Sequence, residues 1–216
     1  MGWVNKMTVP SRVKAWVRAC EDLWFDATRR VITTGDAPKP SSSEIVGELR
    51  DCHVYAPVRA ANARAALRDL PVADPGQYTF VDVGSGKGRV LFLAAELPFR
   101  KVIGVEFATG LHRQALENIA RYRQWGRRCG DIESVLADAA QFDFPNDNLV
   151  LFLFNPFGPE VMARMLGNLE RSIRMHPRHV VVVMLWPENA DLVGRMEGMR
   201  LFRRTSRYHI YQAGGA

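Results

Sequence analysis

Three glycines at alternate positions, Gly84, Gly86 and Gly88, follow an apolar, β-prone run of the sequence. After them an apolar pattern of helical period resumes through Leu93 and Leu97. Glycine lets a chain turn tightly off a buried strand, and it lets a ligand approach the backbone more closely than a Cβ would permit. The helix that follows offers free backbone N–H groups to that ligand. The spacing therefore predicts a strand, a nucleotide-cradling turn and a helix.

One acid, Asp82, precedes the first glycine by two residues, where its carboxylate can brace the loop or meet a cationic group of the ligand. Other glycine motifs match less well. A dinucleotide loop of the form G-x-G-x-x-G needs no acid there and places its third glycine one residue later. A phosphate loop of the form G-x-x-x-x-G-K-[ST] fails because glycine follows Lys87. A G-x-S-x-G elbow fails because Ser85 directly follows Gly84.

Two further acids stand after predicted strands. Glu106 lies near the end of the segment Lys101 to Phe107, about 20 residues past the glycines, the offset at which Rossmann-like folds hold a ribose. Asp138 follows a short predicted strand at Ile132 to Leu136. The ligand role has an alternative in each case, because an acid after a strand often faces water and Asp138 can cap a turn.

A fourth apolar run, Leu149 to Phe154, is typical of a parallel strand buried on both faces. It leads directly into Asn155, Pro156 and Phe157. In open α/β sheets ligands bind beyond the carboxyl ends of the strands, so these residues are predicted to border the ligand. The alternative is that they only end the strand, since proline cannot continue a central ladder.

The pattern D-x-G-x-G-x-G at residues 82–88 resembles motif I of the class I S-adenosylmethionine-dependent methyltransferases. The resemblance implies S-adenosyl-L-methionine as the cofactor, with Glu106 accepting from its ribose hydroxyls. It also implies that Asp138 takes the adenine amino group while a neighbouring backbone N–H reaches a ring nitrogen. The cofactor-binding residues predicted in this way are Tyr55, Asp82, Gly84, Ser85, Gly86, Gly88, Glu106, Phe107, Asp138, Ala139 and Asn155.

The tetrapeptide at residues 155–158 partly resembles the N-P-P-[YF] motif of methyltransferases that act on amino nitrogen. In that motif the Asn side chain and the following carbonyl hold the N–H groups of the acceptor, and the aromatic ring packs on it. Here the second proline is missing and the aromatic residue comes one place early. The resemblance implies that Asn155, Pro156 and Phe157 are the catalytic residues and favours an amino nitrogen as the acceptor.

From residue 55 to residue 158 the chain is similar to a group of bacterial class I methyltransferases with the signatures G-K-G-R, P-F-x-x-V-I-G-V-E and N-P-F-G. The resemblance implies the activity class and no particular acceptor. Some methyltransferases also carry a Tyr-x-Pro element before motif I, which matches Tyr55 and Pro57 and implies that Tyr55 lines the cofactor pocket. Tyr55 suits equally well a packing role at the turn before an Ala-rich helix that begins near Val58.

The remaining segments complete the α/β fold that this resemblance implies. It is a Rossmann-like class I methyltransferase fold, with a seven-stranded, mostly parallel sheet, helices on both faces and an N-terminal helical extension. Helices are predicted at Leu111 to Trp125 and at Pro159 to Met175, and a fifth strand at His179 to Trp186. Two segments, Met199 to Arg204 and Tyr208 to Gln212, are predicted to form a terminal antiparallel pair.

Residues 1–76 are predicted to be a helical extension that packs on a Rossmann-like methyltransferase domain at residues 77–216. A helix is predicted to begin at Ser11, with apolar residues that include Trp16 and Trp24 along one side. Aromatic residues at helical spacing are more typical of core packing than of a ligand cage.

A second helix of the extension is predicted at Glu44 to Asp51, after a loop rich in proline and serine. Met7 suits a translation start as well as Met1 does, so the first six residues are given no role.

The composition is that of a soluble protein. The chain has 216 residues, of which 47% are hydrophobic, enough to bury one core. It contains no run of about 18 apolar residues, as a membrane helix requires, and it begins with charges where a signal peptide is apolar. The three cysteines and five histidines show neither C-x-x-C nor clustered ligand spacing. We therefore expect a cytoplasmic protein with no metal and no disulfide framework.

The formal net charge is +6, and arginines gather near the C-terminus at Arg200, Arg203, Arg204 and Arg207. Such a cluster can bind nucleic acid, but it is also typical of a solvated surface. The sequence shows no RNA-binding appendage or arginine-glycine repeat. The favoured acceptor is therefore a protein lysine or a small-molecule amine, with nucleic acid possible but not favoured and the oligomeric state open.

Two other classes of function stay open at this point. The chain could be a noncatalytic S-adenosylmethionine-binding scaffold whose basic surface binds a partner. It could also be an NAD-dependent oxidoreductase, although the glycine spacing and the acid Asp82 argue against that class.

Overall fold

The computed structural model describes residues 11–35, 37, 40–46, 55–123 and 127–214. Their helices are α1 (Ser11–Arg29), α2 (Ala60–Arg68), α3 (Arg89–Ala94), α4 (Thr109–Arg121), α5 (Pro159–Met175) and α6 (Ala190–Gly194), with short 3-10 turns at Ser42–Glu44 and Pro75–Gln77. Their strands are β1 (Tyr78–Val83), β2 (Lys101–Glu106), β3 (Ile132–Leu136), β4 (Asn148–Phe154), β5 (Val180–Leu185), β6 (Arg200–Arg204) and β7 (Tyr208–Ala213).

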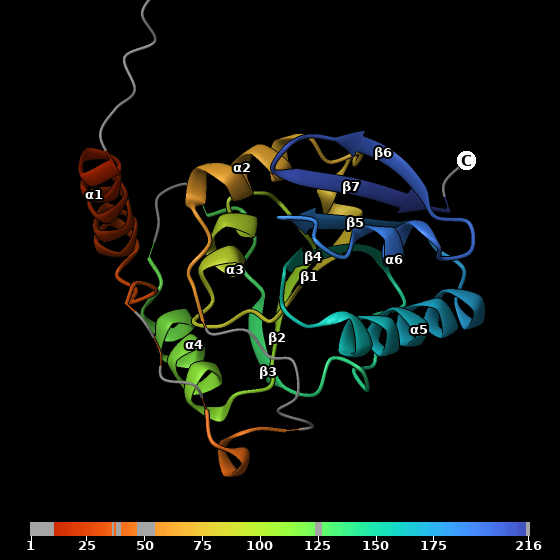
Figure 1. The fold of residues 1–216 in the computed structure, drawn as a ribbon, viewed down its shortest axis with the longest axis horizontal. Helices are drawn as coiled ribbons and strands as arrows, with labels where there is room; N and C mark the ends of the chain where they lie inside the picture. The colour runs from red at the N-terminus through yellow and green to blue at the C-terminus, as the bar shows by residue number, and fades with distance from the viewer. Residues whose placement is uncertain (1–10, 36, 38–39, 47–54, 124–126, 215–216) are drawn as a thin grey trace, which may run out of the picture.

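The described strands form one seven-stranded sheet in the order β3-β2-β1-β4-β5-β7-β6 (Figure 1). Strands β1 to β5 pair in parallel, and β7 runs antiparallel to both β5 and β6. Strand β5, VVVVML, is buried along its whole length, as expected for a parallel strand covered on both faces. The predicted seven-stranded, mostly parallel sheet and its terminal antiparallel pair are confirmed.

The strand register brings the ends of the central strands to one edge of the sheet. Val83, the last residue of β1, pairs with Val105 of β2 and with Leu153 of β4. Phe154, the last residue of β4, pairs with Leu185 of β5. The four segments that follow these strands therefore emerge side by side, which positions the candidate site.

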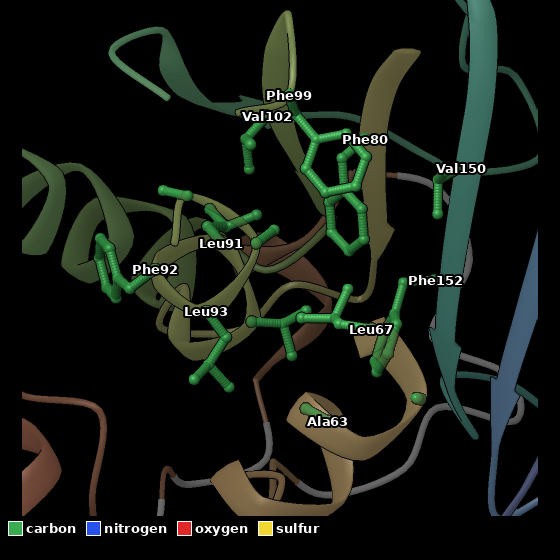
Figure 2. Packing of buried hydrophobic residues seen from close by; sticks show 14 of the residues in the cluster. Ala63, Leu67, Phe80, Leu91, Phe92, Leu93, Phe99, Val102, Val150 and Phe152 are labelled. Carbon is green, nitrogen blue, oxygen red and sulfur yellow. The ribbon is translucent and has the colours of Figure 1, made fainter. Parts of the chain in front are cut away.

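Alternate residues of the central strands face two separate cores. Phe80 of β1 and Phe152 of β4 are fully buried and pack with helices α2 and α3 (Figure 2). Their neighbours Val81 and Leu151 face the opposite side, where α5 and α6 cover the sheet. Burying a side chain as large as phenylalanine contributes about 1.5–3 kcal/mol, so this double layer is a rigid base for the loops.

The predicted helices are confirmed with changes at their ends. Helix α4 ends at Arg121, with Tyr122 as its C-cap, whereas the prediction extended it to Trp125, which lies outside the described residues. Helix α5 has the predicted bounds, and Pro159 at its start suits a position where no helical N–H bond is lost. Of the helix predicted at Glu44 to Asp51, residues 47–51 lie outside the described part.

Helix α1 begins at Ser11 as predicted, but the expectation that its aromatic side packs in the core is wrong. Trp16, Leu23 and Trp24 are 69%, 63% and 64% exposed. The buried side chains of α1 include Phe25 and Arg29, near its C-terminal end, and Figure 1 shows the helix standing at the side of the molecule. Among the described side chains of α1, only those in its last turns therefore contribute to the core, and the exposed aromatic residues lie outside that contact.

Among the described residues, no helix is long and apolar enough to cross a membrane.

Candidate active site

A cavity of about 340 Å³ lies at the carboxyl edge of the sheet. Its walls come from the segments that follow β1, β2, β4 and β5, together with residues 55–58 of the N-terminal extension. The predicted site residues in these walls are Tyr55, Asp82, Gly84, Ser85, Gly86, Glu106, Phe107, Asn155, Pro156 and Phe157. The structure thus brings most of the predicted residues together, and Gly88, Asp138 and Ala139 lie outside this cavity.

The loop at residues 84–88, called the glycine loop, requires its glycines for two reasons. Gly86 has a φ of 56°, and a Cβ on it would lie 2.3 Å from Cε2 of Tyr55. Gly84 has a φ of 76°, and a Cβ there would lie 2.9 Å from Cβ of Pro156. Gly88 is the N-cap residue of α3 and does not line the cavity, so its place is structural. The contact between Gly84 and Pro156 joins the two sequence motifs directly.

Asp82 is a buried carboxylate in the cavity wall, only 3% exposed. Among the described residues, none makes a hydrogen bond to its side chain. Burial, followed by the nearby charge of Glu106, raises the pKa of Asp82 well above its usual value. A buried carboxylate without a partner is costly, so this position favours a ligand that brings a positive charge or an N–H donor.

Glu106 at the end of β2 is held by the backbone. Its Oε2 accepts from the Gly86 N–H at 2.8 Å, and its Oε1 accepts from the Ala108 N–H at 2.9 Å. Burial raises the pKa of Glu106, while these backbone N–H groups oppose the rise. Each carboxylate oxygen has a further lone pair, so Glu106 can shape the glycine loop and still accept from a ligand hydroxyl.

Asp138 and Ala139 line a separate small hollow of about 20 Å³ that shares Phe107 and Phe157 with the large cavity. Oδ1 of Asp138 accepts from the N–H of Ala140 at 2.9 Å. The acid therefore caps its own turn, which is the alternative role that the sequence left open.

Asn155 and Trp186 follow neighbouring strands, β4 and β5, and both have a left-handed backbone. Their φ values are 42° and 53°, and the other described non-glycine residue with positive φ is Arg30. Such a conformation costs about 1–2 kcal/mol in most residues with a side chain, and asparagine adopts it more readily than tryptophan does. Residues held in unusual backbone conformations cluster at functional sites, so this pair makes the second half of the cavity a candidate functional region.

The side chain of Asn155 is oriented by Glu188, which also lines the cavity. Nδ2 of Asn155 donates to Oε2 of Glu188 at 3.0 Å. A carboxylate can only accept, so Glu188 requires the NH₂ end of the amide to face it. The carbonyl end of Asn155 is then turned away from Glu188, as an acceptor for an N–H group of a ligand.

Trp186, Glu188 and Arg89 line the cavity but were missed by the sequence analysis. Trp186 was placed at the end of the fifth strand, and the rule that ligands bind beyond strand ends would have pointed to it and to Glu188. Arg89 opens α3 and is 2% exposed; its side chain contacts the N-terminal extension, which no sequence signal indicates.

Tyr55 combines the two roles that the sequence left open. Its ring lines the cavity and packs against Gly86. Its hydroxyl, however, donates to the backbone carbonyl of Thr33 at 2.7 Å, so that hydrogen bond is made within the protein.

No family model and no curated protein sequence matches this chain. Solved structures do match. A predicted N6-adenine-specific DNA methylase from Listeria monocytogenes has a TM-score of 0.55 at 16% identity, over 74% of this chain and 52% of that protein, so the chain spans about half of its length. An RNA methyltransferase from Salinibacter ruber, in complex with S-adenosyl-L-homocysteine, has a TM-score of 0.51 at 19% identity, over 73% and 92% of the two chains. TrmN from Thermus thermophilus has a TM-score of 0.53 at 21% identity, over 72% and 49%.

These similarities are at the level of the fold. The chain has the Rossmann-like fold of the S-adenosylmethionine-dependent methyltransferases, as predicted.

Proposed function

We propose that this protein binds S-adenosyl-L-methionine in the large cavity and transfers its methyl group to an amino nitrogen. The observation that carries the proposal is the meeting of two motifs at one cavity. The glycine loop and Glu106 form one wall, and Asn155 to Phe157 form the wall opposite Gly84. The fold shared with structures that are named as methyltransferases supports the same activity.

The cavity is chemically suited to this cofactor. Asp82 offers a buried carboxylate without a hydrogen-bond donor among the described residues, which suits the ammonium group of the cofactor. Oγ of Ser85 is buried in the same wall, also without a partner in the described part of the chain. The Tyr55 ring packs on Gly86 in the same wall, and Glu106 retains lone pairs for hydroxyl groups.

When bound, the cofactor supplies a methyl group that is already activated for transfer, so positioning and exclusion of water matter more than acid–base chemistry. Asn155 would accept an N–H of the acceptor through Oδ1, because Glu188 holds its Nδ2. Phe157, 5% exposed, and Trp186, 48% exposed, would flank the acceptor and exclude water. A neutral amine attacks with its own lone pair, and the methylated nitrogen then releases its extra proton to water, so these residues need only orient the amine.

The acceptor class is part of the proposal. The preference against nucleic acid drawn from the sequence finds no support, since solved structures that share the fold are named as DNA and RNA methyltransferases. Exposed Trp186 offers a surface on which a base can stack. Its backbone N–H donates to the carbonyl of Arg207, in the turn that leads back to the exposed arginines of β6. A nucleobase amino group is therefore the first acceptor to test, before a protein lysine or a small amine.

Calorimetric titration with S-adenosylmethionine, S-adenosylhomocysteine and NAD tests the cofactor, with Glu106→Ala as the matched variant. We expect the first two ligands to bind, and to bind at least about tenfold more weakly to Glu106→Ala, because the substitution removes the carboxylate that accepts from the Gly86 and Ala108 N–H groups and from the ligand. Binding of NAD alone would favour an oxidoreductase and overturn the proposal.

Transfer of labelled methyl from the donor to total RNA, genomic DNA, protein extract and small-molecule extract, in separate reactions, then identifies the acceptor. Retained cofactor binding with no labelled product in any fraction would favour the noncatalytic scaffold.

A further inference from the structure

The backbone segment at residues 31–35, called the strap, lies against the glycine loop. Nζ of Lys87 donates to the carbonyls of Thr34 and Gly35, both at 2.9 Å. A lysine ammonium that binds two backbone carbonyls holds the strap against the loop. Lys87 therefore faces the N-terminal extension and not a ligand phosphate.

Asn118 of α4 joins the strap to the loop a second time. Its Nδ2 donates to the carbonyls of Ile32 and Lys87, at 3.0 and 2.9 Å, and its Oδ1 accepts from the Ile32 N–H at 2.8 Å. Asn118 is 1% exposed and is not among the residues that line the cavity. Its three hydrogen bonds therefore hold two backbone segments in register without contact to a ligand.

Arg89, directly after the loop, makes the third connection. Its Nε donates to Oγ1 of Thr33 at 2.8 Å, and its Nη1 donates to Asp22 of α1. Thr33 in turn donates to Asp26 of α1 through its backbone N–H, at 2.8 Å, and through its hydroxyl. A buried guanidinium is tolerated when it is paired in this way, so the two acids of α1 stabilise the arginine at the start of α3.

The glycine loop needs such an external restraint for a physical reason. Glycine permits the positive φ values at Gly84, Gly86 and Gly88, but it also permits many other conformations and loses the most entropy when one is fixed. A loop ordered before the ligand arrives binds more tightly than one that must be ordered on binding. Residues outside the motif are therefore required to keep it in the cofactor-binding shape.

We infer that the strap is this restraint, and that Asn118 and Thr33 are positioning residues for S-adenosylmethionine although neither lines the cavity. The inference rests on the proposed function for the identity of the ligand. It assigns residues of the N-terminal extension to the cofactor site, through contacts with the outer side of the glycine loop.

The test compares variants that cut the strap from the loop with one that loosens the extension elsewhere. Asn118→Leu removes the bridge, and Thr33→Val removes the hydroxyl while Thr33→Ser keeps it. The control is Glu96→Gln, because Glu96 anchors α1 through Arg29 at 2.6 Å and α2 through Arg64 at 2.7 Å, and does not line the cavity. The readouts are S-adenosylhomocysteine affinity by calorimetry, thermal unfolding, and hydrogen exchange of peptides that cover residues 31–35 and 84–88.

We expect Asn118→Leu and Thr33→Val each to weaken S-adenosylhomocysteine binding about tenfold and to speed exchange in the glycine loop. Thr33→Ser should stay within about twofold of the wild type, since it keeps the hydroxyl. Glu96→Gln should lower the unfolding temperature but leave the affinity within about twofold and the loop exchange unchanged.

Two results would overturn the inference. One is unchanged affinity and unchanged loop exchange in Asn118→Leu. The other is a loss of affinity in Glu96→Gln equal to that in Asn118→Leu at the same loss of thermal stability. If the wild type binds no S-adenosylhomocysteine, the proposed function fails, and hydrogen exchange still decides whether the strap holds the loop.

Discussion

The two halves of the cavity differ in how they are held. The half that we propose to bind the cofactor lies around the glycine loop and is largely buried. The Gly86 N–H donates to Glu106, Asn118 donates to the Lys87 carbonyl, and Lys87 donates to carbonyls of the strap. The half that we propose to bind the acceptor, at Asn155 and Trp186, has left-handed backbone and is partly exposed. A hydrogen bond from its amide to the Glu188 carboxylate orients Asn155. The first half is a wall that is ordered before a ligand binds, and the second half is partly open to solvent.

This difference between the two halves indicates which part of the cavity can set specificity for the acceptor. A cofactor that is always the same can be met by a fixed and fully ordered wall. An acceptor has to enter and leave, so its side of the site cannot be equally enclosed. Changes in the glycine loop should therefore abolish binding of the cofactor, whereas changes in the acceptor half should slow transfer and leave cofactor binding intact.

The largest effect is expected for Gly86→Ala. The new Cβ would lie 2.3 Å from the Tyr55 ring and at a φ of 56°, so the loop has to move. We expect S-adenosylhomocysteine affinity to fall by more than about a hundredfold in calorimetry. The control is Gly167→Ala, in the interior of α5 with nothing within 4 Å of the new Cβ, which should stabilise the protein by about 0.5–1 kcal/mol and bind normally. Normal binding by Gly86→Ala would show that cofactor binding does not require the glycine loop to keep this conformation.

The next effect concerns Asn155, where the amide can be separated from the strained backbone. Asn155→Gly removes the amide but tolerates the φ of 42°, whereas Asn155→Ala removes the amide and disfavours this φ more than asparagine does. Both variants should lose about a hundredfold in the rate of label transfer and bind S-adenosylhomocysteine like the wild type. Asn155→Ala alone should be less stable, by about 1 kcal/mol, in thermal unfolding. Full transfer by Asn155→Gly would remove the amide from the mechanism.

A smaller effect is expected from pH, through Asp82. Burial raises the pKa of Asp82, so its charged form is disfavoured in the folded protein without ligand. The contribution of this group to stability is therefore greatest below its unfolded pKa of about 3.9, and it declines as pH rises toward the folded pKa. A bound cation favours the charged form, so S-adenosylmethionine affinity should rise as the pH is raised through the elevated pKa of Asp82, with release of protons in calorimetry.

The control for the pH effect is Asp82→Asn, which cannot titrate. Because burial also raises the pKa of Glu106, the slope of affinity against pH should become smaller in this variant without vanishing. An unchanged slope would assign the titration to Glu106 and show that Asp82 does not meet the cationic end of the cofactor.

The smallest effect is expected for Trp186→Ala, since this side chain is 48% exposed and contributes one wall of the entrance. We expect the KM for the acceptor to rise about five- to tenfold, in line with the loss of one stacking contact, at unchanged cofactor affinity. Trp186→Phe should recover most of the loss because it retains an aromatic face. An equal rise in both variants would argue against stacking.

The sequence by itself determined the sheet, and it placed the proposed cofactor-binding residues at the carboxyl ends of its strands. Apolar runs that end in glycine, acid or Asn-Pro indicate buried parallel strands whose carboxyl ends share an edge. The strand register then brings Asp82, Glu106 and Asn155 to the same edge of the sheet, because each lies at or beside the carboxyl end of its strand. These features are local in sequence, so pattern and spacing are sufficient to find them.

The tertiary structure alone decided how those residues are supported. Asn118 and Lys87 meet the strap across 86 and 53 positions of the sequence, and Glu188 meets Asn155 across 33. The aromatic side of α1 was predicted to be buried and is exposed, because periodicity gives a helix face but not the neighbour that covers it. Contacts between segments distant in sequence depend on the packing of the whole domain, which no single segment encodes.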